Sequence, residues 1–487
     1  MIHNRNHHST FLSNLIFYLK PWFLFIAYKF FMVQKYFVFS FALLSTIFSY
    51  SQSSLPSNIF LKTLPDGLQV MVIEDHSVPL ATIEIAVKNG SYTEPPEYNG
   101  LSHLYEHMFF KANKDYPSQE AFMDRVKGLG ISFNGTTSTE RVNYFFTLPK
   151  FNLTAGLKFM NAAIQYPKFD STEMKKENAV VDGEFQRNES SPFFALRDTI
   201  NHHLYGDMYS RKNVIGNHEV ILSATPAKME TIKNKYYWPN NSLLTIAGDV
   251  NHEDVFKQVA TIIGGWKPSG FDPFKKYPIP EFKPLKKDDY FVVSSENARV
   301  PVAVYNWFGP DTRNDVKSTY AADVFSYILS QNSSKLSKAL LDSGLALQVN
   351  LSYQPQKYGG TISLSVVPNP TKIKACIDGV EKQIKMFDKD DYFSDEQMAT
   401  AKRQLEISDI REKEVTSNYV HTLSFWWCSA TLDYYFTYLD NLRKVSRTDI
   451  QQYVRKYIKN KPFAAGLLVS PAMQQQVHPE TFFKASN

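Results

Sequence analysis

The pair His103 and His107, with Glu106 between them, constrains the fold more than any other feature of this chain. Residues three and four apart share one face of an α-helix, so these side chains converge only if this stretch is helical. Two imidazoles aimed at one point suit a divalent metal such as Zn²⁺. A glutamate beside them suits a base acting on a metal-bound water. The alternative is a helix that carries two surface histidines.

Apolar residues around the motif predict that this helix is buried. In an apolar interior an unpaired polar group costs a few kcal/mol, so buried imidazoles and a buried carboxylate need partners. A bound metal would be such a partner. The flanking apolar residues are Leu101, Leu104, Met108 and Phe109.

A second acidic pair offers a third ligand. Glu177 and Glu184 lie in a helix-like stretch that starts near Ser171, and they are separated by seven residues, or two helical turns. Both carboxylates therefore face the same way. One could bind the metal while the other orients a ligand histidine. The alternative is a solvated helix face without a ligand.

These motifs resemble those of the pitrilysin/insulinase family of zinc peptidases, the inverzincins, in which H-x-x-E-H is joined to a glutamate farther along the chain. Glu184, which lies 77 residues after His107, fits that glutamate, and Glu177 fits the family's upstream acid. The similarity extends over nearly everything from about Leu55 to the C-terminus. Other stretches that resemble the family include Phe133–Ser138, Asn143–Phe146, Tyr237–Asn241 and Ile246–Val250.

The resemblance implies a role for each residue. His103, His107 and Glu184 would bind one Zn²⁺ per chain, and water would fill the open position. Glu106 would be the general base and then the proton donor to the leaving amine, while Glu177 would orient a ligand from outside the coordination sphere. A substrate peptide would be held as an added strand. The residues expected to hold it are Asn134, Gly135 and Thr136.

An internal duplication predicts the architecture. Val78-Pro79-Leu80-Ala81 aligns with Val300-Pro301-Val302-Ala303, and strand, helix and strand patterns follow each in the same order. In this register the second helix, Ser318–Ser330, has no H-x-x-E-H. We therefore expect an α+β fold of two homologous domains, each an antiparallel-rich mixed sheet with helices packed on it, as in processing-peptidase-like metalloproteases. The expected boundaries are 52–265 for the zinc-binding catalytic domain, 266–287 for a linker and 288–487 for an inactive domain.

The chain departs from the family at one point. Active members have an Arg and a Tyr, seven residues apart in a C-terminal-type domain, that support the substrate. Leu340 stands where the Arg is expected and Leu347 where the Tyr is expected. Leucine donates no hydrogen bond, so this domain cannot supply that part of transition-state stabilisation. The resemblance therefore implies a homologous partner subunit that carries the Arg/Tyr pair, as in heterodimers with one zinc-binding chain. Tyr353 is a less favoured substitute.

The rest of the sequence gives little support for nucleic-acid binding or for a cysteine-based site. The formal net charge is +5, without clustered basic runs, so binding to nucleic acid has little support. Two cysteines, Cys376 and Cys428, form neither a disulfide framework nor a zinc spacing, and Cys428 is expected to be a buried free thiol. His202 and His203 are expected in a loop, without a ligand role.

The N-terminal residues resemble an export signal. Lys35 precedes an apolar run, Tyr36–Tyr50, that is too short to span a bilayer comfortably. Small residues before Gln52 suit a cleavage site, so residues 1–51 are expected to be a signal peptide, and translation is expected to begin at Met32. The mature chain would then be periplasmic or secreted. The alternative is an uncleaved membrane anchor.

Three functions fit the sequence. A zinc endopeptidase that acts on extended or unfolded peptides is favoured by the intact His103, Glu106, His107 and Glu184. A non-catalytic scaffold of the same fold is the second. A peptide-binding carrier in which the metal is only structural is the third.

Overall fold

The structure is a computed structural model that describes residues 55–484. The expected signal segment, 1–51, and its start at Met32 lie outside the described residues. Within the described part, no helix combines the length and the apolar character that a bilayer crossing needs.

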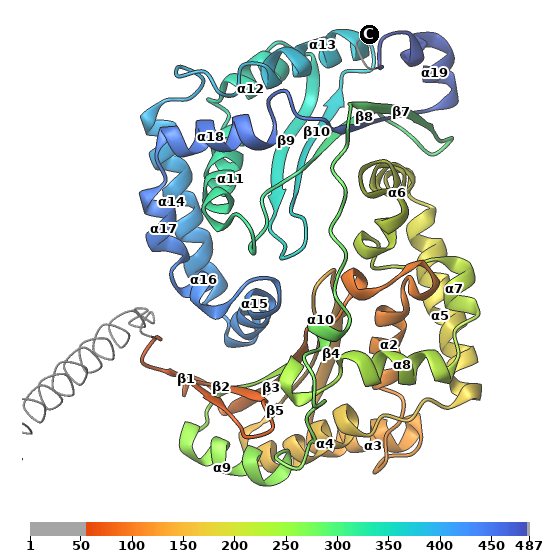
Figure 1. The fold of residues 1–487 in the computed structure, drawn as a ribbon, viewed down its shortest axis with the longest axis vertical. Coiled ribbons are helices and arrows are strands. Elements are labelled where there is room, and N and C mark those ends of the chain that lie inside the picture. The colour runs from red at the N-terminus through yellow and green to blue at the C-terminus, as the bar shows by residue number, and fades with distance from the viewer. Residues whose placement is uncertain (1–54, 485–487) are drawn as a thin grey trace, which may run out of the picture. The chain divides into compact units, whose positions relative to one another are not determined.

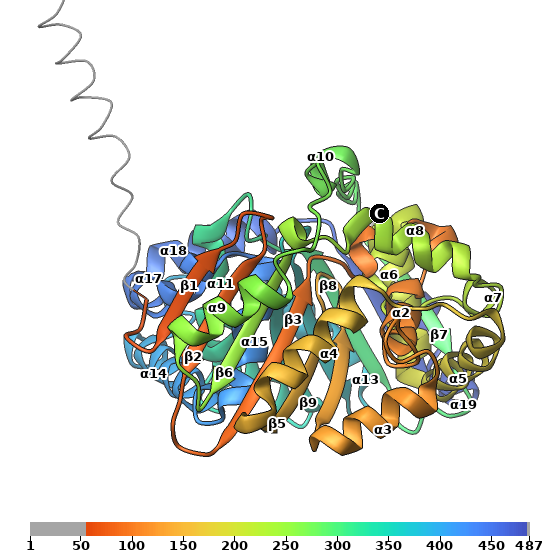
Figure 2. The same ribbon diagram turned by 90° about the horizontal axis from the view of Figure 1, so that it is seen from below.

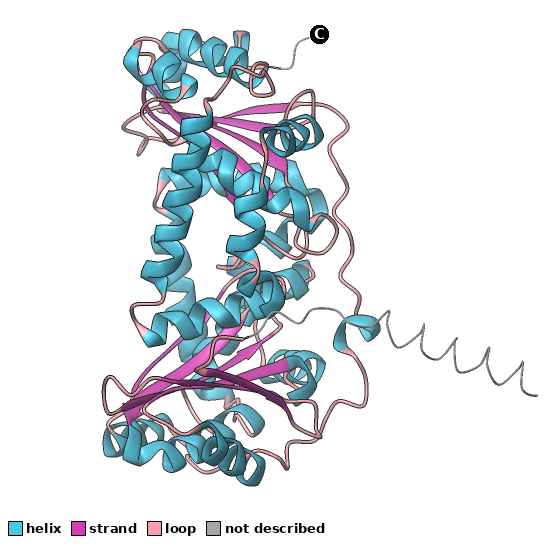
Figure 3. Ribbon diagram, turned by 90° about the vertical axis from the view of Figure 1, so that its left-hand side faces the viewer, coloured by secondary structure: helices cyan, strands magenta, loops and turns pink. Residues whose placement is uncertain are grey.

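The first half is built on a six-stranded mixed sheet, visible in Figures 1 and 3. Its strands pair antiparallel except for the parallel pair β2–β6. Strand β4 forms one edge, next to β5. In sheet order the strands are β1 (Ile59–Thr63), β2 (Gln69–Glu74), β6 (Ser242–Gly248), β3 (Leu80–Val87), β5 (Val142–Pro149) and β4 (Ser132–Thr137).

The second half repeats this arrangement with five strands. Its one parallel pair, β7–β11, corresponds to β2–β6, and its edge strand β9 corresponds to β4. The α+β fold expected from the duplication is therefore confirmed, with two antiparallel-rich mixed sheets. In sheet order the strands are β7 (Asp289–Ser294), β11 (Ala464–Val469), β8 (Val302–Phe308), β10 (Thr361–Pro368) and β9 (Ala346–Gln354).

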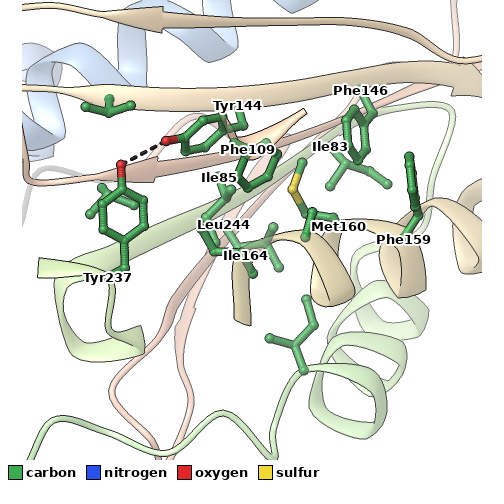
Figure 4. Close-up of a cluster of buried hydrophobic side chains, with 14 of the residues drawn as sticks. Ile83, Ile85, Phe109, Tyr144, Phe146, Phe159, Met160, Ile164, Tyr237 and Leu244 are labelled. Carbon is green, nitrogen blue, oxygen red and sulfur yellow. Dashed lines mark hydrogen bonds between the residues drawn. The ribbon is translucent and has the colours of Figure 1, made fainter. Parts of the chain in front are cut away.

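Helices of the first half enclose a large apolar core on one face of its sheet, part of which is drawn in Figure 4. Phe109 of the motif helix stacks on Tyr144, whose hydroxyl hydrogen bonds that of Tyr237 at 2.8 Å. This packing fixes the motif helix on the sheet. The helices are α2 (Leu101–Phe109), α3 (Gln119–Leu129), α4 (Leu153–Gln165), α5 (Ser171–Glu189), α6 (Pro192–Tyr205), α7 (His218–Leu222), α8 (Pro226–Tyr236), α9 (His252–Ile262) and α10 (Pro273–Lys276).

The second half has a core of its own beneath β8, β9 and β10. The helix equivalent to the motif helix, α11, carries no histidine, as the sequence register predicts. The helices are α11 (Val316–Leu329), α12 (Lys335–Ser337), α13 (Ile373–Ile384), α14 (Asp395–Glu412), α15 (Thr416–Ser429), α16 (Leu432–Phe436), α17 (Tyr438–Lys444), α18 (Arg447–Tyr457) and α19 (Pro471–Val477).

Each half sends one helix to the sheet of the other half. Helix α15 buries Val420, Leu423 and Trp427 against the face of the first sheet that is opposite α4 and α9 (Figure 2). Helix α6 packs Leu196 on Leu468 of β11 and Ile200 near Ala464 of the same strand. Cys428 of α15 is a buried free thiol, as expected.

The position of α6 corrects one expectation. His202 and His203 lie within this helix and not in a loop. The helix forms there because its apolar residues recur every four positions, at Leu196, Ile200 and Leu204, and this stripe is buried against the second sheet.

Candidate metal centre

The start of helix α2 is fixed by a buried carboxylate. Glu94 accepts hydrogen bonds from the backbone N–H groups of Gly100 (2.8 Å) and Ser102 (2.6 Å), which are otherwise unpaired at a helix N-terminus. Burial raises the pKa of Glu94 to about 7, although these bonds oppose the rise. Gly100 has φ of +91°, and a Cβ on it would lie 2.5 Å from the Cα of Gly216. A side chain at Gly100 would therefore push the motif helix out of place.

The structure brings the expected ligand residues together. Nε2 of His103 lies 3.7 Å from Oε2 of Glu184, and Nε2 of His107 lies 3.9 Å from the same oxygen. One donor atom from each residue falls within 4.8 Å of the others. Among the described residues, this is the one such cluster of three or more metal-binding side chains. Two imidazoles and one carboxylate fit the ligand set of a catalytic zinc ion.

The second acid of helix α5 lies behind His107. Oε1 of Glu177 is 2.8 Å from Nδ1 of His107, and its Oε2 is 2.6 Å from Nζ of Lys111. Burial tends to raise the pKa of Glu177, but the bonds to His107 and Lys111 outweigh it and the pKa is lowered. The ionised carboxylate therefore holds Nδ1–H of His107 and leaves Nε2 free toward Glu184.

The two imidazoles are held in different electrostatic environments. Burial, with the nearby charge of His107, lowers the pKa of His103 to about 4, which favours the neutral form that a metal requires. Burial also lowers the pKa of His107, but the bond to Glu177 and the charges of Glu184, Glu177 and Glu106 outweigh it and the pKa is raised. The negative charge around His107 would equally attract a cation.

Glu106 lies beside the cluster and under strand β4. Its Oε2 accepts a hydrogen bond from the Thr137 hydroxyl at 2.6 Å. Burial raises the pKa of Glu106, although this bond opposes the rise. A Cβ on Gly135 would lie 2.8 Å from Cγ of Glu106, so only glycine lets the strand pass this close. The carboxylate is thus positioned to exchange protons near the cluster.

The edge of strand β4 is open on the side away from β5. The N–H of Gly135 donates to the side-chain oxygen of Asn134 at 2.9 Å. The hydroxyl of Thr136 donates to Asn143 and accepts from Arg141 at 3.1 Å. Arg141 also donates to Ser424 of α15 at 3.0 Å, so the second half braces this strand. An exposed strand edge can pair with an extended peptide.

A cavity of about 520 Å³ opens over the site. His103 and Glu106 form one wall and the end of strand β4 forms another. The remaining walls are formed by residues of helix α6, by Lys212, and by Gln354 at the end of strand β9 in the second half. The cavity joins a candidate metal cluster, a candidate base and a peptide-binding edge.

Three of these contacts were not expected from the sequence. Glu94, Lys111 and Thr137 hold Ser102, Glu177 and Glu106 respectively. Lys111 had a local signal, since it follows His107 by four positions and so lies near the same face. Glu94 is eight residues before Ser102 but lies outside any helix or strand, so no spacing rule identifies it. Thr137 reaches Glu106 from strand β4.

Family models match both halves of the chain. A model described as Insulinase (Peptidase family M16) matches residues 69–217, and a model described as Peptidase M16 inactive domain matches residues 223–405. The matched segments contain the metal cluster and most of the second half, respectively.

Similar proteins come from bacteria and plants. The chain is 26% identical over 208 residues to the zinc protease YmxG of Bacillus subtilis, a match that covers 43% of this chain and 50% of that protein. It is 26% identical over 197 residues to a probable mitochondrial-processing peptidase subunit beta of Arabidopsis thaliana, covering 40% and 37%. The chain therefore spans half or less of these relatives. The zinc protease PqqE of Helicobacter pylori is 26% identical over 363 residues, covering 73% of this chain and 80% of that protein.

Solved structures share the fold. A protease from Helicobacter pylori superposes with a TM-score of 0.75 at 21% identity, covering 85% of this chain and 99% of that one. The first half of the periplasmic protease PqqL from Escherichia coli gives a TM-score of 0.70 at 14% identity, covering 86% and 93%. These likenesses establish the architecture of two sheets.

Proposed function

Because this chain belongs to the insulinase family of peptidases, peptidase family M16, we propose that it is a zinc-dependent endopeptidase that hydrolyses extended or unfolded peptides. The observation that carries this proposal is the convergence of His103, His107 and Glu184, with Glu106 beside them and an open strand edge above. The cofactor is Zn²⁺. One ion per chain would be held by the two imidazoles and the Glu184 carboxylate.

Bound zinc would polarise the peptide carbonyl and lower the pKa of a coordinated water. Glu106 takes the proton of the attacking water while the new C–O bond forms. The same carboxyl group then gives that proton to the amine as the C–N bond breaks, so it ends the cycle ionised. Burial raises the pKa of Glu106, which favours holding the proton between these two steps. Glu177 keeps His107 oriented throughout.

The substrate would bind along strand β4 as a further strand of the first sheet. The residues we propose to hold it are Asn134, Gly135 and Thr136, in the middle of this edge strand. Pairing with the backbone recognises an extended chain and not a particular sequence, which suits unfolded peptides. Gly135 brings the bound backbone over Glu106.

We also propose that a homologous partner subunit completes the site. Leu340 is fully buried in the core of the second half, and Leu347 is 56% exposed on strand β9, so neither position can donate a hydrogen bond to a substrate. Tyr353 is committed elsewhere, since its hydroxyl donates to the Pro310 carbonyl at 2.9 Å. The name of the Arabidopsis relative, a peptidase subunit, supports this proposal. Full-rate cleavage by the purified chain as a monomer would overturn it.

The test of the peptidase is the Glu106→Gln variant. We expect it to retain about one zinc per chain and to lose on the order of a thousandfold in peptide cleavage, since a general base contributes about 10²–10⁴. Glu120→Gln, an exposed residue of helix α3, is the matched control and should cleave normally. A wild-type chain that binds zinc but cleaves no peptide, with or without its partner, would favour the scaffold or the carrier.

For location we propose export to the periplasm or the medium, on the apolar run Tyr36–Tyr50 alone. N-terminal sequencing of the mature protein tests this proposal. A first residue at or near Gln52 is expected, whereas an intact N-terminus in the membrane fraction would indicate the anchor.

A further inference from the structure

Helix α6 presents a second face to the cavity of the metal centre. Leu196, Ile200 and Leu204 face the second sheet. Phe194, Arg197 and Asn201, spaced three and four apart, line the cavity that His103 and Glu106 also line. A neighbouring cavity of about 490 Å³, between α6 and strands β8, β9 and β10, shares Asn188, Phe194 and Arg197 with it. The two cavities adjoin at these residues, and we refer to them together as the channel; Arg197, which is exposed, lines both.

Arg197 is the cation of this channel that has free hydrogen-bonding capacity. Lys212, the other cation, donates to the Tyr358 carbonyl (2.9 Å), the Gly359 carbonyl (2.7 Å) and the Gln356 side chain, which uses all three of its protons. Among the described residues, Arg197 makes no hydrogen bond and no ion pair within 4 Å. Its guanidinium lies 5.6 Å from the centre of the Phe194 ring, a contact that restrains its orientation.

The charges around Arg197 point to an anionic ligand. Asp198, the next residue of the helix, lines the same cavity and lies 3.6 Å from Nε2 of His202. Burial raises the pKa of Asp198, although the charges of His202 and Arg197 oppose the rise. A bound Zn²⁺ would offset the charges of Glu106 and Glu184 at the metal side, which leaves Arg197 as the cation of the channel that is available to a ligand. A guanidinium binds a carboxylate through two parallel hydrogen bonds, which fixes the position of the ligand as well as its charge.

We propose that Arg197 determines specificity by binding a carboxylate of the peptide substrate, several residues from the bond that is cut. The carboxylate comes from an acidic side chain or from the C-terminus of the peptide. This inference rests on the proposed function for the identity of the ligand as a peptide. It adds a charge preference to strand pairing, which alone does not discriminate between sequences.

The test measures binding, so it does not depend on cleavage. In a Glu106→Gln background of the full chain, fluorescence anisotropy gives Kd values for a neutral extended peptide, for versions with a single Gln or Glu at successive positions, and for each with a free or an amidated C-terminus. We expect one position, or the free C-terminus, to tighten binding about five- to tenfold. In Arg197→Ala, the ratio of the Kd of the uncharged peptide (Gln or amidated) to the Kd of its charged counterpart (Glu or free C-terminus) should fall to about one.

The matched control is Arg187→Ala, which removes an exposed charge one turn beyond Glu184 but lines neither cavity. It should keep the wild-type ratio, and Arg197→Lys should keep part of it because a lysine retains the charge without the paired hydrogen bonds. A ratio that persists in Arg197→Ala, or falls equally in Arg187→Ala, would overturn the inference. A charge preference, together with a wild-type chain that cleaves nothing with or without its partner, would refute the peptidase and leave this site standing.

Discussion

Replacing Glu177 by glutamine should weaken zinc binding without removing a ligand. The side chain is 7% exposed, and it bonds His107 at 2.8 Å and Lys111 at 2.6 Å. Glutamine keeps the shape, but it removes the charge that holds Nδ1–H of His107 and leaves the Lys111 ammonium without its carboxylate. Outer partners of metal-binding histidines are worth about 10- to 100-fold in affinity, or about 1.4–2.8 kcal/mol.

Competition with a chromophoric chelator measures the zinc Kd of the variant. Glu173→Gln, which makes the same change on the same helix where the carboxylate contacts only Lys176, should bind zinc as the wild type does. The double variant Glu177→Gln/Lys111→Met removes the unpaired ammonium. If it restored wild-type affinity, the loss would come from Lys111 and not from the orientation of His107. A Kd within about twofold of wild type in Glu177→Gln would refute the argument outright.

Two further predictions concern strand β4 and a half-buried lysine. Gly135→Ala should lower peptide cleavage about a hundredfold at unchanged zinc content, because its Cβ would lie 2.8 Å from Cγ of Glu106 and displace the base; equal rates with full metal would contradict this. Burial lowers the pKa of Lys88 to about 8, so the unfolded chain binds the proton more tightly and stability rises from pH 8 to pH 10.5. The advantage of Lys88→Met in free energy of unfolding should therefore shrink by about 3 kcal/mol between pH 7 and pH 10.5, measured by chemical denaturation; a constant difference would contradict it.

Much of the candidate site followed from local spacing. His103, Glu106 and His107 lie within two helical turns, and Glu177 and Glu184 repeat that logic on a second helix. The contact between the two helices is a tertiary one, which spacing alone does not predict. The resemblance to a family indicated that Glu184 meets the two histidines. Thr137 could not be identified, because its bond to Glu106 depends on the register of strand β4 over helix α2.

The duplication could be recognised for a similar reason, since strand and helix periods repeat along the chain. The packing partners of the helices could not. The apolar stripe of α6 signals burial, but nothing local indicates that the surface covering it belongs to the other half of the chain. The same is true of Val420 and Trp427 in α15, which an inspection of the second half alone would assign to its own core.

This exchange of helices ties the chemistry to a distant sheet. Helix α5 ends at Glu189 and α6 begins at Pro192, so two serines are all that separates the helix of Glu184 from one anchored on β11. A displacement of that sheet is therefore expected to shift the last turns of α5, which carry Glu184, the carboxylate that we propose as a zinc ligand. A subunit that bound only the second half would thus change the affinity for the metal without contacting the metal site.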